Sequence, residues 1–419
     1  MDQAGGRRGP AVTTPAPSGQ RIGIGVAAVT VASAITSALG YLVPVLGART
    51  LAPADLGALA TVLAIAGIVA VPGMGLQIAV AVHRAKHPGT SARRAGWLAG
   101  GACAGVVALL APAAGPLLDV PATVILLLAV YTGAIVTSGR WVGELQGDER
   151  FLQLAVGMAI QAAGRYGGLS AGLVLGAGLT GSMLIGTVTA LLIPPALGLL
   201  TRSVPGARNG LDITARQVFT ACSATLAMLV VSYADLLLAR ALLPAAETGA
   251  YAVGTVLTKG AIWAPQVVTV LALPRLAQGS RRALILAIGL VTASGAGLVA
   301  ASAIAGGLAF RVAGGPDYVG LGRYAPVFAA TGAIYAVVYV LVNAQVAAGA
   351  KWPSAPLWAG TGVLLVVAGW LAPHTFPAIM WCATGTALLI LVATAVPNVV
   401  RHRRIRGTPP SDAKVALSD

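Results

Sequence analysis

Long apolar stretches separated by short polar segments run through almost the whole chain. A helix needs about 20 predominantly apolar residues to cross a bilayer core of roughly 30 Å. Lipid offers no partners for backbone amides and carbonyls, so stretches of this length must be helical. The pattern therefore predicts an all-α, polytopic membrane protein with about twelve transmembrane helices, at residues 22–47, 55–82, 95–113, 121–139, 152–176, 180–200, 217–241, 248–273, 282–307, 322–347, 353–372 and 377–399.

A short segment of the chain recurs 192 residues later. Leu51–Ala60 reads LAPADLGALA and Leu243–Ala252 reads LPAAETGAYA, with five identical positions and an acid kept at a sixth. The two copies lie after the first and the seventh stretch, so an even number of spans separates them. We therefore predict two six-helix bundles with the same orientation, as in alternating-access transporters. The predicted divisions are a disordered cytoplasmic tail, the first bundle, a cytoplasmic linker, the second bundle and a basic cytoplasmic tail, at 1–21, 22–200, 201–216, 217–399 and 400–419.

Composition favours lipid over water as the main solvent. The chain of 419 residues is 57% hydrophobic and 9% charged, whereas a soluble domain carries about 25% charged residues. With the N-terminus inside, 21 of the 27 lysines and arginines fall in inner segments, as the positive-inside rule requires. The net charge of +15 thus reflects topology, and no nucleic-acid partner is expected. We predict a multi-pass protein of the cell (inner) membrane with both termini cytoplasmic.

Tryptophans lie near the predicted span ends. Aromatic side chains with a polar edge anchor helices at the membrane interface. Five positions are predicted to act in this way: Trp97, Trp141, Trp352, Trp370 and Trp381.

Two cations lie in the middle of predicted spans. Arg165 shares one broad face of its helix with Gln161, and Lys259 follows Thr255 along another helix. An arginine at this depth costs a few kcal/mol on insertion scales and usually faces a protein interior or a wet cavity. Either cation is predicted to line a cavity that receives an anionic substrate, or to act in helix packing. If the two face one another across the bundles, they suit phosphate or pyrophosphate.

One acid, Asp235, lies well inside a predicted span, nearer its outer end. Three interpretations stay open. The carboxylate is a site for a coupling cation, a partner of Lys259 in one conformation, or a structural acid that pairs with Arg240.

Two stripes of hydroxyl and aromatic residues complete the candidate site. Such groups suit sugar binding, and they equally suit hydrogen bonding between helices. The stripes include Ser33 and Ser37 in the first span and Tyr335, Tyr339 and Asn343 in the tenth.

Recognised catalytic and cofactor motifs are absent from the sequence. There is no glycine-rich phosphate loop, zinc motif or nucleophile elbow. The three cysteines lie far apart in apolar stretches and are predicted to be packing residues. We therefore expect no enzyme activity, no metal site and no cofactor. The polar segment Gly143–Phe151 (GELQGDERF) is predicted to be a structural inner loop.

Several segments together resemble a known family. They are GARTLAPADLGALA (Gly47–Ala60), GELQGDERF (Gly143–Phe151), the run Asp235–Arg240, and Thr248–Tyr251 with Lys259, Pro265, Pro274 and Arg275. In these pieces and in span order the chain resembles the lipid-linked oligosaccharide flippases, a polysaccharide-biosynthesis family of the multidrug/oligosaccharidyl-lipid/polysaccharide (MOP) exporter superfamily. Relatives that flip the peptidoglycan precursor typically have fourteen spans and charges in the first span, and this chain departs from them in both respects.

The resemblance implies two bundles forming a V around a central cavity. It implies that a polyprenyl-pyrophosphate-linked oligosaccharide is turned from the inner to the outer leaflet, with Arg165 and Lys259 as the candidate cavity cations. Expected partners are this lipid-linked glycan, membrane lipids, and a glycan polymerase or glycosyltransferase. A multidrug/cation antiporter of the same superfamily, with Asp235 as coupling acid, is the alternative. A membrane glycosyltransferase or polymerase is disfavoured, since no large outer loop or cluster of carboxylates is present.

Overall fold

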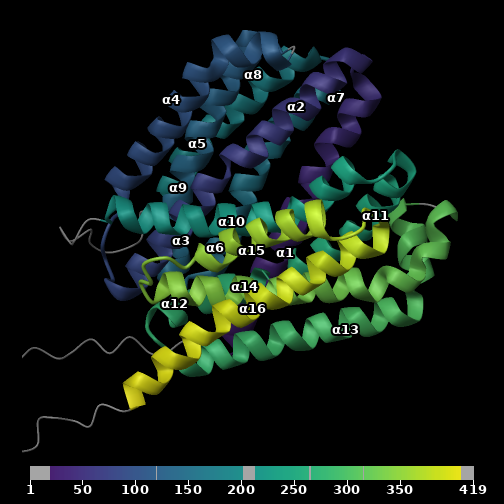
Figure 1. The fold of residues 1–419 in the computed structure, drawn as a ribbon. Helices are drawn as coiled ribbons and strands as arrows, with labels where there is room; N and C mark the ends of the chain where they lie inside the picture. The colour runs from purple at the N-terminus through teal and green to yellow at the C-terminus, as the bar shows by residue number, and fades with distance from the viewer. Residues whose placement is uncertain (1–18, 119, 202–212, 264–265, 315, 407–419) are drawn as a thin grey trace, which may run out of the picture.

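The computed structural model describes residues 19–118, 120–201, 213–263, 266–314 and 316–406 (Figure 1). Every element in the described part of the chain is a helix. The helices are α1 (Gly19–Thr50), α2 (Pro53–Val69), α3 (Val71–Lys86), α4 (Arg93–Leu118), α5 (Ala122–Gly147), α6 (Phe151–Ala162), the π-helical η1 (Ala163–Gly167), α7 (Gly168–Val174), α8 (Gly178–Leu191), α9 (Ile193–Thr201), α10 (Ala215–Leu242), α11 (Ala245–Trp263), α12 (Gln266–Ala277), α13 (Arg281–Gly314), the 3₁₀-helical η2 (Pro316–Tyr324), α14 (Ala325–Ala347), α15 (Ala355–Val366), the π-helical η3 (Val367–Leu371) and α16 (Phe376–Arg406).

The predicted all-α architecture is confirmed. Each predicted span coincides with one helix or with consecutive helical segments. Within the described residues, ten helices are long and apolar enough to cross a membrane. The other two predicted spans are α6–η1–α7, which carries Gln161 and Arg165, and the 17-residue apolar segment Ala355–Leu371.

Two local predictions are wrong. The inner loop predicted at Gly143–Phe151 is mostly helical, because α5 continues to Gly147 and only a tight turn precedes α6. Trp141 is 7% exposed and lies against the Arg140 guanidinium, 3.7 Å from the ring centroid. It is therefore a buried residue of α5 and not an interfacial anchor.

The 192-residue repeat extends to whole elements. α1 and α10 end at Thr50 and Leu242, and α2 and α11 begin at Pro53 and Ala245, each pair 192 residues apart. In the first half the helix that follows is interrupted once, at Ala70 between α2 and α3, and in the second half α11 and α12 lie on either side of residues 264–265, which are outside the described residues. The predicted tails and linker, at 1–21, 201–216 and 400–419, fall largely outside the described residues.

The two bundles meet along α1, α3, α5, α10 and α12, and Lys86 of α3 also donates to the Ala347 carbonyl oxygen of α14; we call this contact region the seam. In the first bundle α3, the segment after the break, contacts α10 and α12, and α12 of the second bundle also contacts α1 and α5. Figure 1 shows the bundles together near α3 and α10, with α2 and α11 well apart. The halves are thus joined at one end and diverge towards the other.

Small residues bring α3 and α5 into close contact. Gly139, Gly143 and Gly147 follow one another at four-residue spacing on α5. A Cβ at each position would lie 2.6–2.8 Å from a backbone oxygen of α3, so only glycine fits. Close approach through such small residues is how membrane helices pack without a hydrophobic driving force between them.

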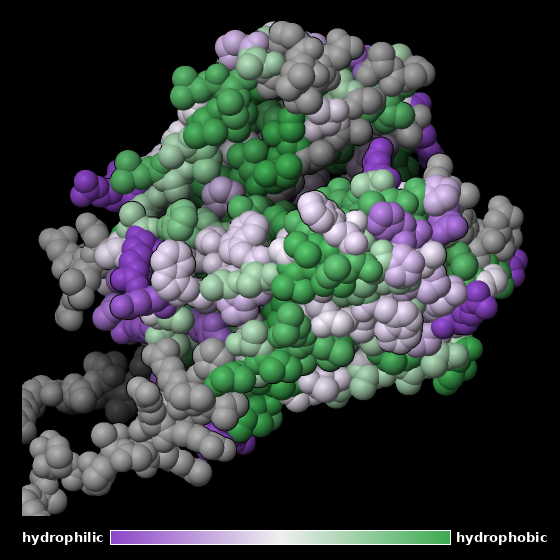
Figure 2. All heavy atoms as spheres, in the orientation of Figure 1, coloured by the Kyte–Doolittle hydropathy of each residue, from purple (hydrophilic) through white to green (hydrophobic). Residues whose placement is uncertain are grey.

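The outer surface matches a lipid environment. Large apolar side chains such as Leu109, Ile304 and Trp370 are 81–88% exposed. Figure 2 shows hydrophobic side chains over the flanks and hydrophilic ones gathered towards the left and right ends of the view. This distribution suits a bundle that crosses a membrane between those two ends.

Candidate functional site

Arg165 lies in a π-helical turn in the middle of its span. The turn η1 releases backbone carbonyls from regular helical bonding, and side chains of neighbouring helices bond to them. The Tyr131 hydroxyl donates to Arg165 O at 2.8 Å, and the Thr189 hydroxyl donates to Gly164 O at 2.9 Å. π-helical turns inside α-helices are frequent at functional sites. Here the turn is held by α5 and α8, which fixes the direction of the arginine.

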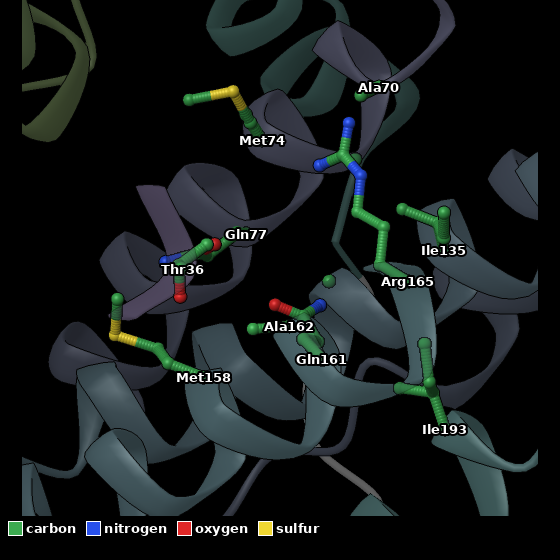
Figure 3. Close-up of a pocket in the computed structure, with 12 residues that line it drawn as sticks. Thr36, Ala70, Met74, Gln77, Ile135, Met158, Gln161, Ala162, Arg165 and Ile193 are labelled. Carbon is green, nitrogen blue, oxygen red and sulfur yellow. The ribbon is translucent and has the colours of Figure 1, made fainter. Parts of the chain in front are cut away.

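The Arg165 side chain extends into a cavity of about 100 Å³ within the first bundle. Figure 3 shows the guanidinium directed towards Ala70, at the break between α2 and α3. Gln161 lines the same cavity one turn away, as their shared helix face predicts, and its Nε2 donates to Ser138 Oγ at 2.6 Å. Polar groups from other helices also line it, namely Thr36 of α1 and Gln77 of α3.

The electrostatics of this cavity favour an anion. No Asp or Glu is among its described lining residues. Arg165 Nε is buried and has no hydrogen-bond partner among the described residues. A buried donor without a partner costs free energy, and an anion entering the cavity would accept from it. The volume suits a phosphate-sized group or several waters.

Lys259 lies on α11 and contacts α10 of the same bundle. Its Nζ donates to the Ser232 carbonyl oxygen and to Ser232 Oγ, the latter at 3.0 Å, and lies 3.3 Å from the ring centroid of Tyr233. The Arg165 cavity is lined only by residues from Thr36 to Ile193. The structure therefore places the two cations in separate surroundings, one in each bundle. It does not show them facing one another across one cavity.

Asp235 is 5% exposed and lies one turn beyond Ser232 on α10. One carboxylate oxygen accepts from the Leu236 amide at 2.9 Å, and the other accepts from the Tyr251 hydroxyl at 3.2 Å. No ion pair with Lys259 or with Arg240 is present between these described residues. In this conformation the carboxylate is held by these two hydrogen bonds.

The hydroxyl stripes bond mainly to their own helices. Ser33 and Ser37 donate to carbonyls one turn earlier, at 2.9 and 3.1 Å, and Thr255 donates to Ala252 O at 2.7 Å. Such bonds satisfy a hydroxyl inside a helix without any ligand.

The three residues of the tenth span lie in or beside the seam. Tyr335 is 2% exposed and belongs to the apolar core of the second bundle. Tyr339 and Asn343 line a void of about 10 Å³ shared with Ile78 and Ala221. This volume holds about one water, so the present conformation gives these residues a packing environment.

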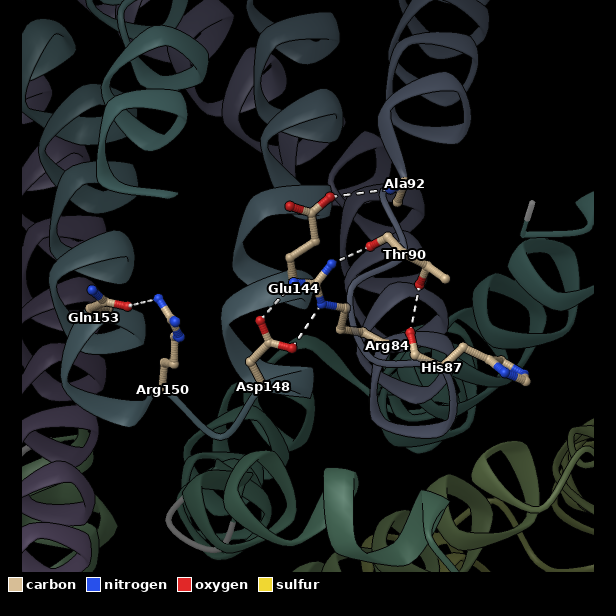
Figure 4. A network of polar contacts seen from close by, with 8 residues as sticks. All are labelled: Arg84, His87, Thr90, Ala92, Glu144, Asp148, Arg150 and Gln153. Carbon is tan, nitrogen blue, oxygen red and sulfur yellow. Dashed lines mark hydrogen bonds and ion pairs between the residues drawn. The ribbon is translucent and has the colours of Figure 1, made fainter. Parts of the chain in front are cut away.

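The turn after α5 carries polar contacts that sequence reasoning undervalued. Figure 4 shows Asp148 bonded to Arg84, at 2.7 and 2.9 Å, and Glu144 accepting from the Ala92 amide. These contacts join α3, α4 and α5. The adjacent Glu149 has φ of 55°, which a non-glycine residue rarely adopts, and it pairs with Arg275 of the other bundle at 3.1 Å.

Gln146 makes a buried polar contact across the seam. It is 1% exposed, accepts from Gln77 Nε2 at 2.8 Å, and donates to Val270 O at 3.0 Å. Val270 O would normally accept from the amide four residues later, but that residue is Pro274, which has none. Gln146 of the first bundle thus bonds to the carbonyl that a proline leaves free in the second. The proline within α12 is the sequence signal for this contact.

Comparisons with known proteins identify the fold. No family model matches the chain, and no curated protein matches its sequence. A MOP superfamily transporter from Pyrococcus furiosus is similar with a TM-score of 0.72 at 12% identity, over 94% of this chain and 100% of that chain. An outward-facing multidrug resistance MATE family transporter gives 0.71 at 13% identity, over 94% and 100%. A eukaryotic MATE transporter gives 0.68 at 14% identity, over 92% and 99%.

The class of fold follows from these matches. The chain has the two-bundle architecture of MOP and MATE transporters, with about twelve transmembrane helices. In the Pyrococcus furiosus protein, the reverse polarity of the binding pocket suggests a different function for that protein. Among the described residues no group of three or more His, Cys, Asp or Glu is placed to hold a metal ion.

Proposed function

We propose that this protein is a flippase that carries a polyprenyl-pyrophosphate-linked oligosaccharide from the inner to the outer leaflet by alternating access. The observation that carries the proposal is Arg165: among the described residues its buried Nε has no hydrogen-bond partner, and no carboxylate lines its cavity. A guanidinium grips phosphate through paired hydrogen bonds. The side-chain amides of Gln77 and Gln161 in its wall each have two N–H donors and can donate to phosphate or sugar oxygens.

The position of the cavity supports transport over a purely structural role. It adjoins the break between α2 and α3. Interrupted helices of this kind line substrate sites in repeat transporters. Movement of an anionic headgroup outward is favoured by a membrane potential that is negative inside, at about 2.3 kcal/mol per charge per 100 mV. Such a protein would act in the inner membrane with glycan-assembling partners.

The test measures outward movement of a fluorescent polyprenyl-pyrophosphate sugar in vesicles containing the purified protein. Arg165→Gln is expected to lower the rate by about tenfold or more, since a charge-assisted hydrogen bond is worth roughly 1.5–3 kcal/mol. Arg165→Lys keeps the positive charge but loses the paired donors of the guanidinium, so its rate should lie between those of the wild type and Arg165→Gln. Arg240→Gln removes an exposed cation of α10 in the other bundle and serves as the control. An unchanged rate in Arg165→Gln refutes the cavity assignment.

A multidrug/cation antiporter is the second candidate. The observation that favours it is the buried carboxylate of Asp235 next to Tyr251, because such an acid can bind a coupling cation when the bundle rearranges. Expression would then confer drug resistance that Asp235→Asn abolishes. Resistance that is absent, or that survives the substitution, refutes this candidate.

A further inference from the structure

A second polar cavity lies in the seam, apart from the Arg165 site. Its volume is about 280 Å³, and both bundles contribute to its wall. Lys86 comes from the end of α3, whereas Arg216, Gln217 and Thr220 come from the first turns of α10, and Gly349 follows α14. This volume is just below that of typical drug-sized pockets, and it suits a small polar headgroup.

The charges around the seam cavity are one-sided. Lys86 and Arg216 both line it, and its described lining residues include no carboxylate. The positive-inside rule accounts for cations in loops near this end. It does not require that cations from opposite bundles share one cavity.

The dipole of α10 adds to the positive potential in the seam cavity. The N-terminus of a helix carries about half a positive charge, which acids in the first turn usually offset. The first turn of α10 contains no acid, and it carries Arg216 instead. The capping box between Thr214 and Gln217 uses the Gln217 Oε1 atom. That geometry leaves the Gln217 amide NH₂ able to donate into the cavity.

We propose that the seam cavity binds a phosphate-bearing anion, held by Lys86, Arg216 and the start of α10. Arginine offers a forked donor and lysine a point charge, which together with amide and hydroxyl donors match a phosphate. The source is either an anionic lipid headgroup or a free phosphate compound. The proposal does not depend on the proposed function.

Binding at this site has a conformational consequence. Lys86 and Arg216 belong to opposite bundles, so the complete site exists only while the seam is closed. A ligand that contacts both sides shifts the equilibrium towards the arrangement it binds best. The anion would therefore favour the conformation described above.

The experiment uses the full-length Arg165→Gln protein in nanodiscs, so that binding at the first cavity does not mask the second. In phosphatidylcholine nanodiscs, inorganic pyrophosphate is titrated and heat is measured. In a second arm, the melting temperature is compared between phosphatidylcholine and phosphatidylglycerol nanodiscs. Adding Lys86→Gln and Arg216→Gln should weaken pyrophosphate binding by about tenfold or more, or abolish the stabilisation by phosphatidylglycerol. Both side chains are exposed, so these variants should fold.

Arg94→Gln is the matched control, because it removes an exposed cation at the start of α4 outside the cavity. If Lys86→Gln and Arg216→Gln weaken pyrophosphate binding and Arg94→Gln does not, the ligand is a soluble phosphate compound. If they abolish the stabilisation by phosphatidylglycerol and Arg94→Gln does not, the ligand is a lipid headgroup. The proposal is overturned if neither arm shows binding, or if Arg94→Gln weakens binding as much. Pyrophosphate binding that vanishes with Arg165→Gln alone, together with no stabilisation by phosphatidylglycerol, would also overturn it and would leave the first cavity as the site.

Discussion

Replacing Gln146 with methionine should open the seam more than breaking the ion pair between Glu149 and Arg275. Both contacts join the two bundles at the C-terminal end of α5, since Gln146 lies in its last turn and Glu149 in the turn that follows. Methionine keeps the length of the glutamine side chain but cannot donate to Val270 O. The comparison tests whether the carbonyl freed by Pro274 makes the buried amide the stronger contact.

The magnitudes follow from burial. Gln146 is 1% exposed, and a hydrogen-bond acceptor left unpaired in such surroundings costs about 1–2 kcal/mol, or roughly 5- to 30-fold in a population ratio. The Arg275 and Glu149 side chains are 45% and 28% exposed. Solvent screening limits such a pair to at most about 1 kcal/mol, which is roughly fivefold. The buried amide therefore dominates.

Cys222 reports on the opening of the seam. It lies on α10 against α3, with Sγ 3.7 Å from the Pro72 carbonyl oxygen of the other bundle. The rate of alkylation by a membrane-permeant maleimide would be measured with Cys103 and Cys382 replaced by serine. Gln146→Met should raise this rate about 5- to 30-fold, and Arg275→Gln should raise it less.

The control for this assay is Gln77→Met. It removes the bond between Gln77 and Gln146 inside the first bundle and leaves the contact with Val270 in place. A rise with Gln77→Met equal to that with Gln146→Met would mean that disorder within the bundle, and not the lost cross-seam bond, exposes Cys222. A larger effect of Arg275→Gln would also refute the reasoning.

Three further substitutions test the packing and polar contacts. Asp148→Ala leaves Arg84 buried without its partner, at 7% side-chain exposure, and should lower stability by about 3 kcal/mol, measured as a lower denaturant midpoint. Gly75→Ala places a Cβ 2.6–2.7 Å from the backbone of Cys222, so it should force the seam apart and raise maleimide labelling. Tyr251→Phe removes the hydroxyl that bonds the buried carboxylate of α10 and should lower the melting temperature, at a cost of about 1–2 kcal/mol; an unchanged melting temperature would contradict that role.

The helices were predictable because hydropathy alone requires them. An apolar stretch in lipid has one way to satisfy its backbone, so its length fixes the element. The repeat was predictable for a related reason, since ten residues at a constant offset implied equivalent helices. Position along a helix also predicted that Gln161 and Arg165 share a face, and both line one cavity.

Contacts across the seam were not predictable in this way. The hydrogen bond from Gln146 to Val270 O joins residues 124 positions apart. Its energy depends on Pro274, which has no amide to donate to Val270 O. Asp148 contacts Arg84 and Glu149 contacts Arg275 from neighbouring positions, and this arrangement depends on the positive φ of Glu149. No periodicity in the sequence encodes such a turn. The charged residues of Gly143–Phe151 therefore predicted a structural role for the segment, but the sequence did not predict which residues they contact.

The two halves of the repeat differ at the positions of Arg165 and Lys259. At the 192-residue offset, Lys259 corresponds to Gly67, and at the 204-residue offset of the two π-helical turns, Arg165 corresponds to Gly369. Glycine at the matching position means that the architecture is built without a cation there. Because a charge at this depth costs several kcal/mol on its own, a residue that the repeat does not require must be kept for another reason. The asymmetry of the two halves supports the proposal that Arg165 serves a ligand, whereas the contacts of Lys259 with Ser232 and Tyr233 give that residue a structural role in this conformation.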